Sequence, residues 1–146
     1  MKEFFKDIKI HVLTGVSYMI PFAIAGAVIM GIARIGAMMY GITDIWDVSH
    51  ATAGGLIPFF NTLDGLGGLS LSLMLPVFAA FIAYSIADRP ALVAGLVGGL
   101  LANKLETGFL GALAAGLIAG YVVKIMANKI KLPESASSII PVFILP

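Results

Sequence analysis

Long intervals without charged residues constrain this chain more than any other feature of its sequence. They are clearest at residues 10–33, 65–87 and 107–127, the last of which extends past Lys124 because a lysine amine can reach back to the headgroups. A charged side chain costs about 2.5–3.5 kcal/mol at the centre of a bilayer, so uncharged intervals are candidate membrane spans. A helix rises about 1.5 Å per residue and the hydrocarbon core is about 30 Å thick, so the first interval is long enough to cross.

The composition leads to the same class of protein. Hydrophobic residues make up 60% of the chain and charged residues 12%, whereas soluble domains have about 45–50% and about 25%. In lipid, helices are favoured because they satisfy their own backbone hydrogen bonds. The sequence therefore predicts an all-α transmembrane bundle of about four spans. The apolar run at residues 139–146 is too short to cross, so we expect the start of a fifth span and a chain that is a fragment.

The fourth span is expected at residues 91–103, which is shorter than the ~17 residues usually needed to cross. Four crossings with a cytoplasmic N-terminus agree with the positive-inside rule, because they place nearly every cation inside. These inner cations are Lys2, Lys6, Lys9, Arg89, Lys124, Lys129 and Lys131. The alternative is a re-entrant hairpin at residues 91–103, which would put the last three of them outside.

Several functional classes are excluded by residue types that are missing. The chain has no cysteine, which excludes disulfides, thiolate metal sites and a catalytic cysteine. Its net charge of +1, without a basic cluster, argues against nucleic-acid binding. A full crossing separates His11 from His50, so they cannot share a metal ion. We therefore expect no metal, no cofactor and no catalytic residue, since no carboxylate pair, nucleophile elbow or phosphate-binding loop is present.

Small residues recur along one side of the span at residues 107–127. The residues of this helix-packing set are Gly108, Gly111, Ala112, Gly116 and Gly120, with Gly95 and Gly99 in the segment before it. Helices with such faces approach each other closely in membranes. Both static packing within the chain and a sliding or dimerising interface agree with this pattern.

Two further regions are interpreted from their charges. Residues 42–64 carry several acids and Trp46, which predicts an external loop with an interfacial aromatic anchor. Arg34 directly follows the first span, toward the outer face, and is interpreted as a snorkelling helix end, the alternative being a counter-ion for an intramembrane acid.

Four stretches, taken in order, resemble a known family. They are His11-Val-Leu-Thr-Gly-Val-Ser-Tyr-Met-Ile-Pro-Phe22, Leu75-Pro-Val-Phe-Ala-Ala-Phe-Ile-Ala-Tyr-Ser-Ile-Ala-Asp-Arg-Pro90, Gly95-Leu-Val-Gly-Gly99 and the stretch from Gly108 to Tyr121. The chain is similar in these stretches to the N-terminal half of the IIC (permease) domain of the fructose-type phosphoenolpyruvate-dependent sugar phosphotransferase system.

This resemblance implies a homodimeric permease of the bacterial inner membrane that translocates fructose or a related sugar. The sugar would be presented to a cytoplasmic IIB protein, itself phosphorylated through IIA, for phosphorylation during uptake. Fructose-type IIB uses a cysteine as phosphoryl carrier, so the resemblance implies a separate IIB partner for this cysteine-free chain. Related permeases hold their sugar-contacting Glu and His in the C-terminal half, so the resemblance identifies no catalytic residue here.

Candidate substrate-binding residues are few. Asp88 and Arg89 lie between two spans, where they form either a simple cytoplasmic turn or a gating or docking element. Asn103 and Glu106 belong to a short outer connection and are either solvated or part of a sugar entry path. The scarcity of buried ionisable groups also fits a non-transporting membrane scaffold or a small channel subunit, which are the alternative functions.

Overall fold

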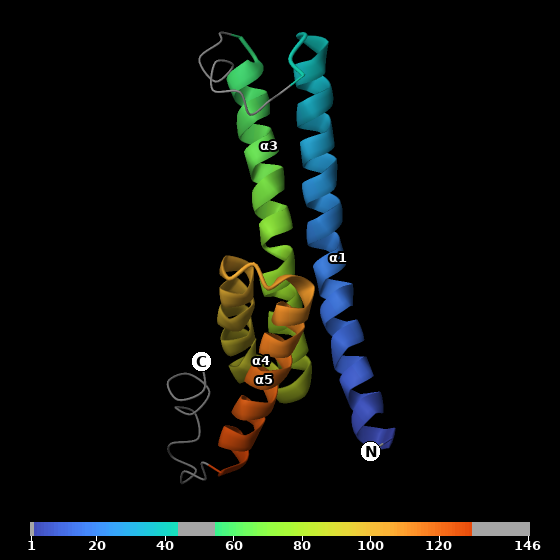
Figure 1. Ribbon diagram of the computed structural model, residues 1–146, viewed down its shortest axis with the longest axis vertical. Helices are drawn as coiled ribbons and strands as arrows, with labels where there is room; N and C mark the ends of the chain where they lie inside the picture. Colours follow the sequence, from blue (N-terminus) through green and yellow to red (C-terminus); the bar gives the residue numbers. More distant parts are fainter. Residues whose placement is uncertain (1, 44–54, 130–146) are drawn as a thin grey trace. The chain divides into compact units, whose positions relative to one another are not determined.

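The computed structural model describes residues 2–43 and 55–129. Within these ranges the chain forms α1 (Lys2–Met39), α3 (Ile57–Ser72), α4 (Met74–Lys104) and α5 (Gly108–Lys129), and no strand (Figure 1). Three helical stretches are long and apolar enough to cross a membrane: Lys6–Met39, Ile57–Lys104 and Gly108–Lys129. The predicted all-α transmembrane fold is therefore confirmed. Trp46, His50, Lys131 and the expected fifth span lie outside the described residues.

Helix α4 is broken near its middle and folds back on itself. Ala87 (φ −141°, ψ 26°) and Asp88 (φ 56°, ψ −153°) are not helical. A Cβ placed on Gly95 in the second half would lie 2.6 Å from the Cβ of Ala83 in the first half. One placed on Gly99 would lie 2.7 Å from the Cα of Pro76. The two halves, residues 74–86 and 89–104, are therefore an antiparallel hairpin, as Figure 1 shows.

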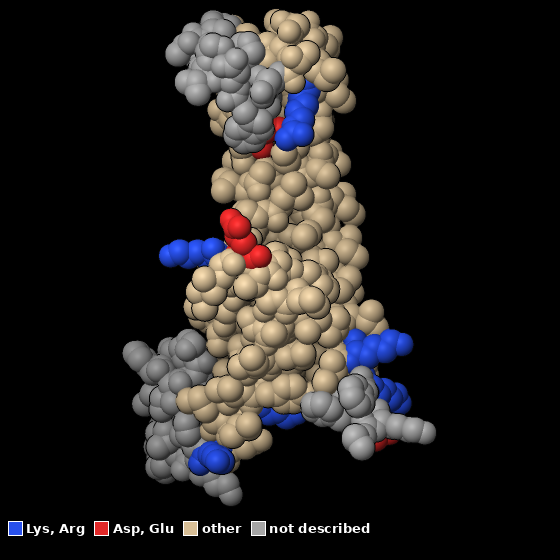
Figure 2. Space-filling view, viewed as in Figure 1, with Lys and Arg blue, Asp and Glu red and all other residues tan. Residues whose placement is uncertain are grey.

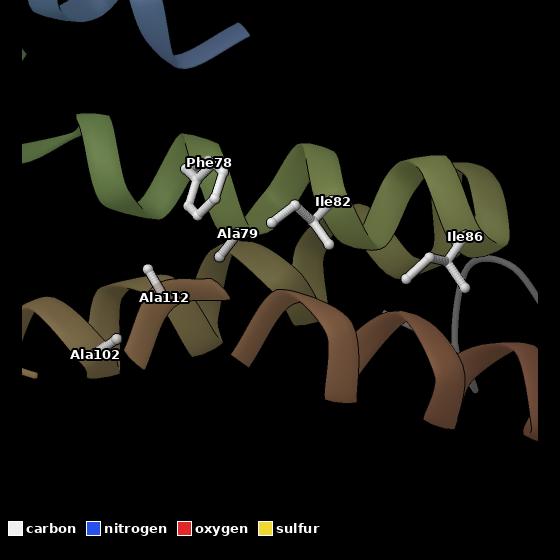
Figure 3. Packing of buried hydrophobic residues seen from close by; sticks show 6 residues of the cluster. All are labelled: Phe78, Ala79, Ile82, Ile86, Ala102 and Ala112. Carbon is white, nitrogen blue, oxygen red and sulfur yellow. The ribbon is translucent and has the colours of Figure 1, made fainter. Parts of the chain in front are cut away.

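The chain divides into two compact units, unit 1 (Met1–Ile20 and Leu73–Pro146) and unit 2 (Pro21–Ser72). In unit 1, helix α5 packs against the α4 hairpin, and the two halves of the hairpin and α5 share one apolar cluster (Figure 3). The buried members of this cluster are Phe78, Ala79, Ile82, Ile86, Ala102 and Ala112. The first turns of α1 complete unit 1, with the ring of Tyr18 stacked on that of Phe81 at 3.8 Å between centroids.

Unit 2 is an antiparallel pair made of the second part of α1 and α3. The helices approach closely at Gly26 and Gly67, because a Cβ on either glycine would lie 2.8 Å from the backbone oxygen of the other. Only glycine permits this separation. Ser70 adds a hydrogen bond of 2.9 Å from its hydroxyl to the backbone oxygen of Phe22.

The structure corrects the external loop that the sequence predicts at residues 42–64. Helix α3 begins at Ile57, so the last part of this interval is helical. Asp64 lies inside α3 and is fully buried. For residues 57–64 the prediction of a loop was wrong, because it rested on Asp64 being a charge that must lie outside the membrane; whether the rest of the interval is external stays a prediction.

Candidate functional site

The most unusual polar feature of unit 2 is an ion pair between its two helices. The Nε of Arg34 in α1 donates a hydrogen bond of 2.9 Å to Oδ1 of Asp64 in α3. The Asp64 side chain is 1% exposed, whereas the Arg34 side chain is 51% exposed. Within the described ranges, Oδ2 of Asp64 has no hydrogen-bond partner, although it is buried. The pair is therefore asymmetric, with a buried acid covered by a half-exposed base.

The register of the two helices positions this pair. Gly36 lies against the ring of Phe60 and Gly26 lies against Gly67, so the intervening residues Arg34 and Asp64 face each other. Ionisable groups inside membrane spans usually pair with one another. Arg34 is thus the counter-ion of Asp64. This is the alternative interpretation of Arg34, and it replaces that of a simple snorkelling helix end. Sequence reasoning missed Asp64, and its only signal was the presence of opposite charges on consecutive apolar segments.

A second polar contact joins α1 to the hairpin in unit 1. Nδ1 of His11 lies 2.7 Å from the hydroxyl oxygen of Ser85, one turn before the break in α4. Asp7 and Lys124 both lie within electrostatic reach of the same imidazole. The start of α1, the tip of the hairpin and the end of α5 therefore lie at one end of unit 1.

The four candidate substrate-binding residues do not form a single cluster. Asp88 and Arg89 are exposed at the tip of the hairpin, where the second half of α4 begins. Asn103 and Glu106 lie where that half ends and the turn into α5 follows. About 21 Å of helix separates the two pairs, at about 1.5 Å per residue. Whether either pair contacts a sugar stays a prediction.

Most of the glycines in the helix-packing set lie against the first half of α4. A Cβ on Gly116 would lie 2.7 Å from the backbone oxygen of Ala79, and one on Gly120 would lie 2.7 Å from Cδ1 of Ile86. Gly108 differs from these, since its φ of +64° and its open surroundings mark the turn at the start of α5. Gly111 faces Thr107 within the same turn.

Comparisons with known proteins identify the family of this chain. A family profile described as "Phosphotransferase system, EIIC" matches residues 13–145. The chain is 38% identical over 144 residues to "Fructose-like permease IIC component 2" of Escherichia coli (strain K12), a match that covers 99% of this chain and 37% of that protein. It is 38% identical over 139 residues to "PTS system fructose-specific EIIABC component" of Bacillus subtilis (strain 168), covering 93% of this chain and 20% of that protein.

An archaeal relative extends the comparison. The chain is 32% identical over 164 residues to "PTS system fructose-specific EIIC component" of Haloferax volcanii, covering all of this chain and 42% of that protein. The chain thus spans less than half the length of each of these three relatives. No solved structure matches it.

Proposed function

Because this chain belongs to the EIIC family of the phosphotransferase system, we propose that it is the N-terminal part of a permease for fructose or a related sugar. Transport is coupled to phosphorylation of the sugar by a separate IIB partner. The observation that carries the proposal is the 38% identity to a fructose-like permease over 99% of this chain. The sugar-contacting carboxylate and histidine would then belong to the remaining part of the permease.

We propose that the phosphoryl carrier of the IIB partner lies outside these 146 residues, which is in keeping with the chemistry of phosphoryl transfer. A thiolate is a strong nucleophile and serves as a covalent carrier, and this chain has no cysteine. The relative from Bacillus subtilis is named as an EIIABC component, and this chain matches only 20% of its length. Most of that relative therefore lies outside the part that this chain resembles. We propose that this chain supplies part of the membrane component of a homodimeric permease in the bacterial inner membrane.

The proposed orientation places the N-terminus in the cytoplasm. The contact between His11 and Ser85 and the proximity of Lys124 support this orientation. They bring the basic start of α1, the hairpin tip with Arg89 and the basic end of α5 to one end of unit 1, and basic residues are favoured on the cytoplasmic side. They also favour the crossing over the re-entrant alternative for residues 91–103, which would separate Lys124 from His11. Lys104 would then lie on the outer side.

Single cysteines test this orientation directly, since the chain contains no other thiol. An impermeant thiol reagent applied to intact cells should label Lys104→Cys and leave Lys9→Cys and Lys129→Cys unlabelled. All three variants should react once the membrane is opened, which controls for buried thiols. Labelling of Lys129→Cys in intact cells would refute the four crossings.

Uptake measurements test the proposed function. Expressed alone, the chain should insert into the membrane but accumulate no radiolabelled fructose. Coexpression with the unmatched remainder of the Escherichia coli relative should restore uptake to well above that of either part alone. Robust uptake by these residues alone would show that the sugar site lies within them. Failure of the two parts to copurify or to transport together would argue for the scaffold alternative.

A further inference from the structure

We propose that Asp88 is a docking residue whose carboxylate, on the exposed tip of the α4 hairpin, contacts the soluble IIB partner. This inference rests on the proposed function, because it names the place where that partner binds. It is drawn from three observations on this turn, namely its backbone conformation, the surroundings of its side chain and the charges at this end of unit 1.

The backbone at Asp88 is strained. Its φ of 56° and ψ of −153° fall in a region that glycine adopts readily and that other residues almost never occupy. Aspartate tolerates the left-handed helical region, but there ψ is positive. A glycine at this position would therefore relieve the strain and close the same hairpin at lower free energy. The residue that the sequence places here is not the one that the turn itself favours.

The side chain of Asp88 does not compensate for this strain. Aspartate in turns usually accepts a hydrogen bond from a nearby backbone amide. Here the side chain is exposed, and no hydrogen bond or ion pair joins it to the residues that the structure describes. The carboxylate therefore contributes no hydrogen bond or ion pair to the part of unit 1 that the structure describes. Strained residues of this kind are concentrated at functional sites, and the exposed carboxylate of Asp88 is accessible to a molecule outside the chain.

The charges around the tip indicate what that molecule is. Separate basic side chains lie around this end of unit 1, with acidic atoms visible among them, as the lower part of Figure 2 shows, and Arg89 is exposed beside Asp88. Anionic lipid headgroups would be attracted by these basic side chains but repelled by the carboxylate of Asp88. A soluble protein can instead offer acids to the lysines and a cationic or amide donor to Asp88. Mixed charge therefore favours a protein over a lipid surface.

Substitution of Asp88 by glycine separates an effect on the stability of the turn from an effect on IIB binding. In the full chain reconstituted in nanodiscs, Asp88→Gly should raise the thermal midpoint by about 3 °C and weaken the binding of purified fructose-type IIB by about tenfold. Asp88→Asn should weaken binding to a similar extent without raising the midpoint, because it removes the charge but keeps the side chain. Surface plasmon resonance measures the affinity and differential scanning fluorimetry the midpoint.

Glu106 supplies a matched control, since it is the other non-glycine residue with positive φ (53°) among the described residues. Glu106→Gly should also raise the thermal midpoint, but IIB should bind this variant as tightly as the wild type. Unchanged IIB affinity in Asp88→Gly would overturn the proposal, as would tighter binding to anionic vesicles with no effect on IIB. Absence of IIB binding by the wild type would instead contradict the proposed coupling itself.

Discussion

Replacing Arg34 with methionine is expected to destabilise the chain by about 3–5 kcal/mol. The reason is that it leaves the carboxylate of Asp64, which is 1% exposed, buried without its base. Removal of one partner of a buried ion pair has a cost of this size because the remaining charge has neither water nor a counter-ion. Unfolding in mixed detergent micelles measures the free energy.

The asymmetry of the pair provides the controls. Asp64→Leu should cost less, about 1–3 kcal/mol, because the Arg34 side chain that it leaves is 51% exposed and can turn toward water. The double variant Arg34→Met with Asp64→Leu should lie within about 1 kcal/mol of the wild type, since two apolar side chains can replace an ion pair. Equal losses in the two single variants would contradict the asymmetric burial.

Substitution of Gly116 by leucine is expected to separate α5 from the hairpin and destabilise the chain by about 3 kcal/mol. A Cβ on Gly116 would already lie 2.7 Å from the backbone oxygen and 3.0 Å from the Cα of Ala79. Backbone atoms cannot rotate away as the end of a side chain can, so the helices themselves must move. Loss of the folded species on size-exclusion chromatography, together with a lower unfolding midpoint, measures the effect.

Gly68→Leu is the matched control for this substitution. Gly68 also lies within a helix, but a Cβ placed there would meet no atom within 4 Å. Leucine at Gly68 should therefore be neutral or slightly stabilising, because it has the higher helix propensity. If Gly116→Leu and Gly68→Leu unfold at the same midpoint, close approach of α5 to α4 is not what stabilises unit 1.

Much of the fold was predictable because the bilayer penalises charge so strongly. The positions of the charges alone predict helices in the regions of α1, α4 and α5. The backbone break at Asp88 lies where the sequence predicts a turn between spans. Opposite charges beside a proline mark this point, since an exposed connection accommodates all three. The helices and this turn depend on residues that are neighbours in the chain, so a single sequence is enough to predict them.

The close contacts of unit 2 were not predictable in the same way. The charge pattern makes Asp64 the boundary of a loop, whereas its partner Arg34 lies 30 residues earlier on another helix. A charge that is neutralised across two helices no longer marks the end of a span, and the sequence does not show which charges are paired. The approach of Gly26 to Gly67 was missed for the same reason, because it depends on the register of two separate segments.

The chemical form of the sugar that enters the cell tests the central claim most directly. Cells that coexpress this chain with the remainder of the Escherichia coli permease, and that contain the soluble phosphotransferase proteins, should accumulate radiolabelled fructose as its phosphate. Accumulation should stop when the IIB protein is removed. Entry of free, unphosphorylated fructose that is independent of IIB would contradict a phosphotransferase permease and favour a channel.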